Sequence, residues 1–155
     1  MSEAPATPLG SIRVSRARFQ LILAFALFAA FHFLPWSTAP GPVGWRIWSA
    51  VLRVPRNWDN ISGLLPTFGF LSAALLLVAS PFLAGVFEES RLVRNLVFVA
   101  SILATISLTG FILWTSIDMG EFHGGSGMIC LMLAQVLHLA GMAMVKRRPP
   151  PALPG

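Results

Sequence analysis

The sequence predicts an all-α integral membrane protein with four transmembrane helices, both ends of the chain in the cytoplasm, and a short amphipathic helix in the first outer loop. Residues of the AVILMFWYC class make up 55% of the 155 residues, and charged residues make up only 11%. A soluble domain usually carries about 25% charged residues. Four long apolar runs occur, and most of the positive charges lie at their ends. We therefore expect a bilayer to surround most of this chain.

The expected spans are apolar runs of about 17–25 residues, the length that crosses a bilayer at a rise of about 1.5 Å per residue. They cover residues 19–36, 67–87, 95–115 and 127–145, and none contains a formally charged residue. Together they form one transmembrane domain, 19–145, between an N-terminal segment, 1–18, and a basic, Pro-rich tail, 146–155. The N-terminal segment has the basic residues of a signal peptide, but no small-residue cleavage site follows the apolar run. We expect a retained first helix.

The distribution of lysine and arginine predicts the orientation, because cytoplasmic loops carry more of both residues. Eight of the eleven basic residues precede the first span, separate the second from the third, or follow the fourth. These segments should be cytoplasmic, which places both termini inside. All five tryptophans fall on the predicted outer side, where indole rings favour the headgroup zone. The abundance of Ala, Arg, Pro and Leu favours a bacterial inner membrane.

The first outer loop, 37–66, is expected to contain an amphipathic helix within WRIWSAVLRV. Its apolar residues recur at spacings of three and four and share one face: Val43, Ile47, Ala50, Val51 and Val54. Arg46, Ser49 and Arg53 share the opposite face. Such a helix lies in the membrane interface with its arginines toward lipid phosphates, or it docks another subunit. The candidate residues for lipid or partner contact are Trp45, Arg46, Trp48, Arg53, Arg56 and Trp58.

Small residues in the fourth span predict close helix packing, because helices in lipid associate through small side chains and polar contacts. Gly127, Ala134 and Gly141 are spaced seven residues apart. His138 faces the same seam, and Gln135 borders it.

The third span carries a hydroxyl stripe at four-residue spacing, formed by Ser101, Thr105 and Thr109. Because the third and fourth spans are neighbours in sequence, we expect them to pack as an antiparallel pair with their polar groups facing each other. Ser80-Pro81 should kink the second span.

The segment SIDMGEFHGGSGMICLM, 116–132, is a candidate metal site. Asp118, Glu121 and His123 would supply hard or borderline ligands, and the soft ligands would come from Met128, Cys130 and Met132. The spacing matches no metal motif. The glycines of this segment are those that a tight turn uses, so we favour a turn between two helices. Cys130 is the single cysteine, so no internal disulfide can form.

Two cofactor hypotheses involve the intramembrane histidines. A haem held by His32 and His138 requires both at one depth, but counting from the inner ends places His138 about 10 Å deep and His32 about 20 Å deep. His138 with Gln135 could instead contact a quinone or handle protons, although a histidine bonded to a facing hydroxyl is the simpler interpretation. We predict no cofactor. Haem, quinone, pigment and copper are the alternatives.

The sequence contains no nucleophile elbow, HExxH or CxxC motif and no paired intramembrane carboxylates, so we expect no catalytic residues and no enzyme. Its basic residues form no nucleic-acid patch. The preferred function is a non-catalytic small membrane subunit, or an accessory or assembly protein, of a larger membrane complex. Its partners would be membrane lipids and other integral membrane subunits. The alternatives are a cofactor-binding redox protein and an oligomeric channel or transporter.

Overall fold

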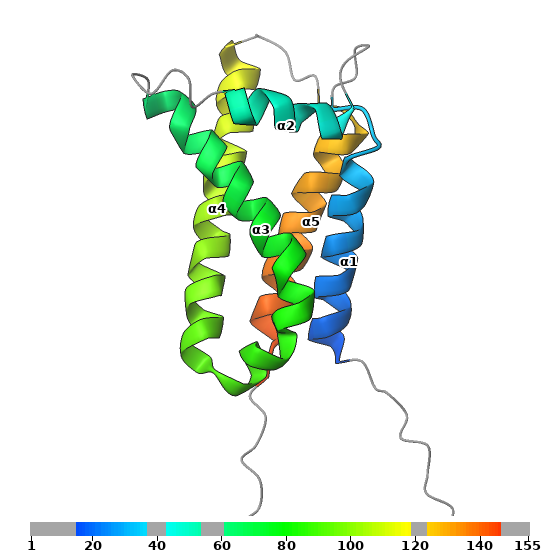
Figure 1. Ribbon diagram of the computed structural model, residues 1–155, viewed down its shortest axis with the longest axis vertical. Coiled ribbons are helices and arrows are strands. Elements are labelled where there is room, and N and C mark those ends of the chain that lie inside the picture. The colour runs from blue at the N-terminus through cyan, green and yellow to red at the C-terminus, as the bar shows by residue number, and fades with distance from the viewer. Residues whose placement is uncertain (1–14, 37–42, 54–60, 119–123, 147–155) are drawn as a thin grey trace, which may run out of the picture.

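The computed structural model describes residues 15–36, 43–53, 61–118 and 124–146, and within these ranges it contains helices and no strand. The helices are α1 (Arg16–Phe31), α2 (Gly44–Arg53), α3 (Ile61–Glu89), α4 (Arg91–Asp118) and α5 (Ser126–Met144). The four longer helices run side by side along the long axis, and α2 lies across one end (Figure 1). For these residues the all-α prediction is confirmed, and α2 is the short helix predicted between the first two apolar runs.

Three segments of the described chain are long and apolar enough to cross a membrane: Thr67–Glu89, Arg91–Gly110 and Ser126–Met144. They correspond to the second, third and fourth predicted spans. Helix α1 has 16 residues and rises only about 24 Å, less than the hydrocarbon core of about 30 Å. By length and composition, three helices of the described chain therefore qualify as spans.

Helix α1 ends at Phe31, although the first span was predicted to continue to Trp36. Pro35 disfavours a helical conformation at the preceding Leu34. The start of α2 also satisfies carbonyl groups that follow α1. The backbone N–H of Gly44 donates to Leu34 O at 2.9 Å, and that of Trp45 donates to His32 O at 3.1 Å. The chain therefore leaves α1 for α2 earlier than apolarity alone suggests.

The order of the helices around the bundle differs from their order in the sequence. Helix α1 packs along α5, and α3 packs along α4. Smaller contacts between α1 and α3 and between α4 and α5 close the ring. The expected pairing of α4 with α5 is present, but the main neighbour of α5 is α1.

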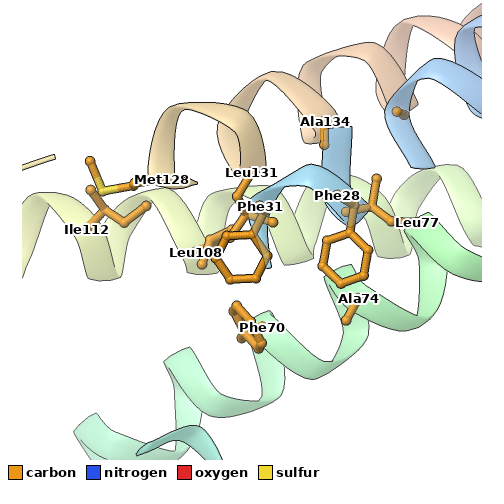
Figure 2. Packing of buried hydrophobic residues seen from close by; sticks show 11 residues of the cluster. Phe28, Phe31, Phe70, Ala74, Leu77, Leu108, Ile112, Met128, Leu131 and Ala134 are labelled. Carbon is orange, nitrogen blue, oxygen red and sulfur yellow. The ribbon is translucent and has the colours of Figure 1, made fainter. Parts of the chain in front are cut away.

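Among the described residues, the larger of two hydrophobic clusters fills the half of the bundle near α2 (Figure 2). Phe28 and Phe31 of α1 stack with ring centroids 5.9 Å apart, and Phe31 meets Phe70 of α3 edge-on. Ile47 and Trp48 of α2 pack against this cluster. Large apolar side chains also cover the outer surface, Leu75 and Leu103 among them, as expected for helices that are apolar all round.

Serine hydroxyls cap two helices at the end opposite α2. The hydroxyl of Ser15 accepts the N–H of Arg18 at 3.2 Å at the start of α1. Ser90 is the one residue between α3 and α4, and its hydroxyl accepts the N–H of Val93 at 3.3 Å. Serine at this position satisfies a helical N–H that has no partner within the helix. These caps fix where the helices begin.

Candidate functional site: a polar cluster inside the bundle

Five polar side chains from three helices lie inside the apolar bundle, four of them in two interhelical pairs, and we call them the polar cluster: Ser80 of α3, Ser101 and Thr105 of α4, and Gln135 and His138 of α5. Ser80, Ser101, Gln135 and His138 are at most 2% exposed, and Thr105 is half-buried. Burying polar groups costs free energy unless they are hydrogen-bonded. The hydrogen-bond partners of these side chains therefore indicate what role the cluster has.

The shortest bond of the cluster joins α3 to α5. The hydroxyl of Ser80 and Nε2 of His138 share a hydrogen bond of 2.6 Å. Ser80 directly precedes Pro81, yet α3 continues through both residues to Glu89. The other ring nitrogen of His138, Nδ1, is buried and has no partner. The sequence predicted a facing hydroxyl for this histidine, and the structure supplies it from α3.

The second bond joins α4 to α5. Thr105 Oγ1 lies 3.1 Å from Oε1 of Gln135 and 2.7 Å from the backbone oxygen of Ser101, so its single proton is shared between two acceptors. Ser101 donates its own hydroxyl to Val97 O within α4. The amide nitrogen of Gln135 is buried without a partner. The expectation that polar groups of the third and fourth spans face each other is confirmed for Thr105 and Gln135.

Two buried polar atoms of the cluster are therefore left unpaired, His138 Nδ1 and Gln135 Nε2. They belong to residues three apart on α5, which share one side of a helix. Buried polar atoms are almost always paired with protein or with ordered water. The pair offers an amide N–H donor and an imidazole nitrogen. A water molecule or the carbonyl group of a ring is the kind of ligand that these groups can hold.

Two glycines of the predicted small-residue seam of α5 face α1 and the residues that follow it, whereas His138 of the seam bonds to Ser80 of α3. Gly127, Ala134, His138 and Gly141 are all buried. A methyl group at Gly127 would lie 2.9 Å from Leu34 O, and one at Gly141 would lie 3.0 Å from Leu21 Cδ2. The absence of side chains at these two positions thus sets the close approach of α1 to α5.

A second polar contact lies where α1 meets α2. The indole N–H of Trp48 donates to Nε2 of His32 at 2.9 Å. Because Nε2 accepts, the ring proton lies on Nδ1, which donates to Phe28 O at 2.9 Å. The two rings are nearly parallel, with centroids 6.0 Å apart. Sequence reasoning missed this pair, since it joins residues on either side of a turn.

The structure gives the two histidines of the haem hypothesis separate partners. His32 uses both ring nitrogens in bonds to Phe28 and Trp48. His138 uses one nitrogen with Ser80. For Nε2 of His32 to bind a haem iron, the hydrogen bond between His32 and Trp48 would have to break.

The candidate metal segment is only partly within the described residues. The side chain of Asp118 and all of Glu121 and His123 lie outside them. Among the described residues, no group of three His, Cys, Asp or Glu side chains could hold a metal ion. Met128 is buried in the larger hydrophobic cluster, and Cys130 packs against it.

The candidate contact residues of α2 occupy different positions. Trp45 and Arg46 are exposed, and the Arg46 guanidinium carbon lies 5.4 Å from the centre of the Trp45 ring. Trp48 is half-buried and faces His32. The Arg53 side chain lies outside the described residues, as do Arg56 and Trp58.

Comparison of the chain with protein-family models, with curated proteins and with solved structures finds no match. Functional inference therefore depends on the residues and geometry described above.

Proposed function

We propose that the protein is a non-catalytic small subunit or accessory protein of a larger membrane complex, in which α1, although shorter than the hydrocarbon core, is a fourth membrane-spanning helix beside α3, α4 and α5 and both ends are in the cytoplasm. The observation that carries this proposal is an unpartnered apolar row along α4, which we call the α4 ridge. Its residues lie along one face at spacings of three, four and, at the last step, seven residues, and all are more than half exposed: Leu92, Leu96, Val99, Leu103, Ile106 and Leu113.

The α4 ridge follows from the position of α4 in the bundle. Only 17% of the most apolar stretch of α4 is buried inside the molecule. The buried share of the corresponding stretch is 39% in α3 and 44% in α5. Rows of side chains at these spacings are those that interlock with the grooves of a neighbouring helix. A partner helix would bury the apolar side chains of α4 that the other helices of the bundle leave exposed.

The polar cluster supports a structural role for the interior. Ser80 bonds to His138 and Thr105 bonds to Gln135, so polar side chains join α5 to both α3 and α4. Such interhelical bonds contribute about 0.6–2 kcal/mol each to helix association in membranes. A network that holds helices together is what a scaffold subunit needs.

The proposed orientation is supported by basic residues at one end of the bundle. Arg16 begins α1, Arg91 begins α4, and Lys146 follows α5. These three helix ends lie together, opposite α2 (Figure 1). Basic residues beside membrane helices favour the cytoplasmic side.

Co-purification from the native membrane tests the proposal. The tagged chain is extracted in mild detergent, and stoichiometric companions are identified by mass spectrometry. Leu103→Trp on the α4 ridge should lose the companions through steric conflict while remaining apolar. Leu75→Trp, on the exposed face of α3, is the matched control and should retain them. Purification of the wild-type chain without companions would refute the subunit role.

A second candidate function, cofactor binding, is favoured by the unpaired Nδ1 of His138 and Nε2 of Gln135. A quinone carbonyl oxygen accepts a hydrogen bond, which Nε2 of Gln135 can donate. Solvent extraction of the purified protein followed by chromatography measures bound quinone. One equivalent that is lost in Gln135→Leu would establish this function, whereas a quinone content equal to that of the detergent blank would exclude it.

A further inference from the structure

A groove of about 570 Å³ lies between α1 and α3 beneath α2, and we call it the aromatic groove. Its lining includes Phe25, Ala29, Phe33, Trp45, Trp48 and Val78. The polar residue of the lining, His32, has both ring nitrogens engaged by Phe28 and Trp48. The groove therefore presents hydrocarbon and aromatic rings to whatever enters it.

The aromatic groove opens on the outer surface of the bundle. Phe33 is 80% exposed and Trp45 is 55% exposed. At Phe25 the aromatic surface continues onto α3, where Phe25 meets Phe82 edge-on with centroids 6.5 Å apart. An apolar groove on the lipid-facing surface of a membrane protein is accessible to the acyl chains of the bilayer.

A cation lies at the rim of the groove. Arg46 is exposed and stacks over Trp45, which lines the groove. No carboxylate of the described residues pairs with Arg46. An amphipathic helix such as α2 lies at the level of the lipid headgroups, where anionic lipids attract basic residues. The rim thus combines positive charge with an apolar groove, a combination that complements an anionic phospholipid.

We propose that the aromatic groove binds one anionic phospholipid, with an acyl chain in the groove and the phosphate at Arg46. Helix α2 crosses from the end of α1 toward α3 (Figure 1), so it covers the headgroup end of the groove. A straight partner helix running along the groove would meet α2, whereas a lipid ends there in its headgroup. The proposal is independent of the subunit role, because it concerns a face formed by α1, α2 and α3.

Native mass spectrometry of the purified, delipidated protein tests this site. The probes are phosphatidylglycerol and phosphatidylcholine with identical acyl chains. The wild-type chain should bind phosphatidylglycerol about fivefold more tightly, as expected for one basic residue beside an anionic headgroup. Arg46→Gln should remove this preference. Arg91→Gln, an exposed arginine at the opposite end of the bundle, should retain it.

A second pair of variants tests the groove itself. Ala29→Phe places a ring in the groove and should remove binding of both lipids. Ala26→Phe, on an exposed face of the same helix and outside the groove lining, should bind like the wild type. Thermal unfolding in detergent verifies that both variants are folded. Equal affinity of the wild-type chain for the two lipids, or equal binding by the two phenylalanine variants, would overturn the proposal. Cross-linking of a protein helix, in place of lipid, at the position of Phe33 would also overturn the proposal.

Discussion

Ser80 and His138 lie 58 residues apart in the chain, and their side chains meet at 2.6 Å inside the bundle. The bond joins α3 to α5, two helices that face each other diagonally and share few other contacts. It therefore ties the pair formed by α1 and α5 to the pair formed by α3 and α4. The stability of the bundle should depend on it more than on hydroxyl groups that bond within one helix.

Replacement of Ser80 by alanine should lower the free energy of unfolding by about 0.6–1.7 kcal/mol, the range for interhelical bonds in membrane proteins. The cause is the loss of the bond at Nε2 of His138, whose Nδ1 is already unpaired. Unfolding of the purified protein in mixed micelles measures the change. Ser72→Ala is the control, because Ser72 bonds to Phe68 O within α3. Equal effects of the two variants would contradict the proposed link between helices.

Gly127→Ala should destabilise the protein by about 1–3 kcal/mol, the usual cost of overpacking. The added methyl group would meet the backbone oxygens of Leu34 and Pro35 at 2.9 and 3.0 Å, and backbone atoms cannot rotate away. Gly85→Ala is the matched control, since a methyl group there meets no atom within 4 Å. The control should be neutral or more stable by up to about 1 kcal/mol through helix propensity. The midpoint of thermal unfolding in detergent compares the two.

A double-mutant cycle tests the bond between His32 and Trp48. The two single variants, His32→Phe and Trp48→Phe, and the double variant should yield a coupling energy of about 0.5–1.5 kcal/mol, the net value of a hydrogen bond. The cycle cancels the volume lost at each position. Micelle unfolding of the four proteins measures the coupling. A coupling near zero would mean that the bond does not hold α2 to α1.

Arg94→Gln should loosen the last turn of α5. The Nη1 group of Arg94 donates to Val145 O at 3.0 Å, and a cation at a helix C-terminus contributes about 0.3–1 kcal/mol. Hydrogen exchange of the amides from Ala140 to Met144 should accelerate about two- to fivefold. Arg91→Gln, which lacks such a bond, should leave the exchange rates unchanged. Unchanged rates in both variants would show that the cap has no effect on α5.

Much of the helical pattern could be predicted because it depends on local composition. Apolar run lengths locate α3, α4 and α5, and the alternation of Ile47 with Arg46 and Ser49 predicts the amphipathic helix α2. The burial of Gly127, Gly141 and His138 follows from spacing on one helix face. These features depend on neighbours within a few turns, which the sequence displays directly.

The partners of His138 and His32 could not be predicted in the same way. Adjacency in sequence favoured a hydroxyl of α4 for His138, but the ring order of the helices places Ser80 of α3 beside it. Depth was the usable signal, because Ser80 lies about 10 Å from the inner end of its predicted span, the depth expected for His138. Pro35 was a local signal for the early end of α1, but the bond from Trp48 to His32 depends on how α2 folds back. That return is a tertiary event with no local signature.

A single residue, Ser90, separates the 29 residues of α3 from the 28 residues of α4. So short a connection cannot reach across a bilayer, and it keeps the end of one helix beside the start of the next. In the proposed membrane setting, the translocation machinery must accept the two helices as one hairpin. Moving the positive charges of Arg91 and Arg94 would invert α3 and α4 together. No redistribution of charge can reverse α4 while α3 stays in place.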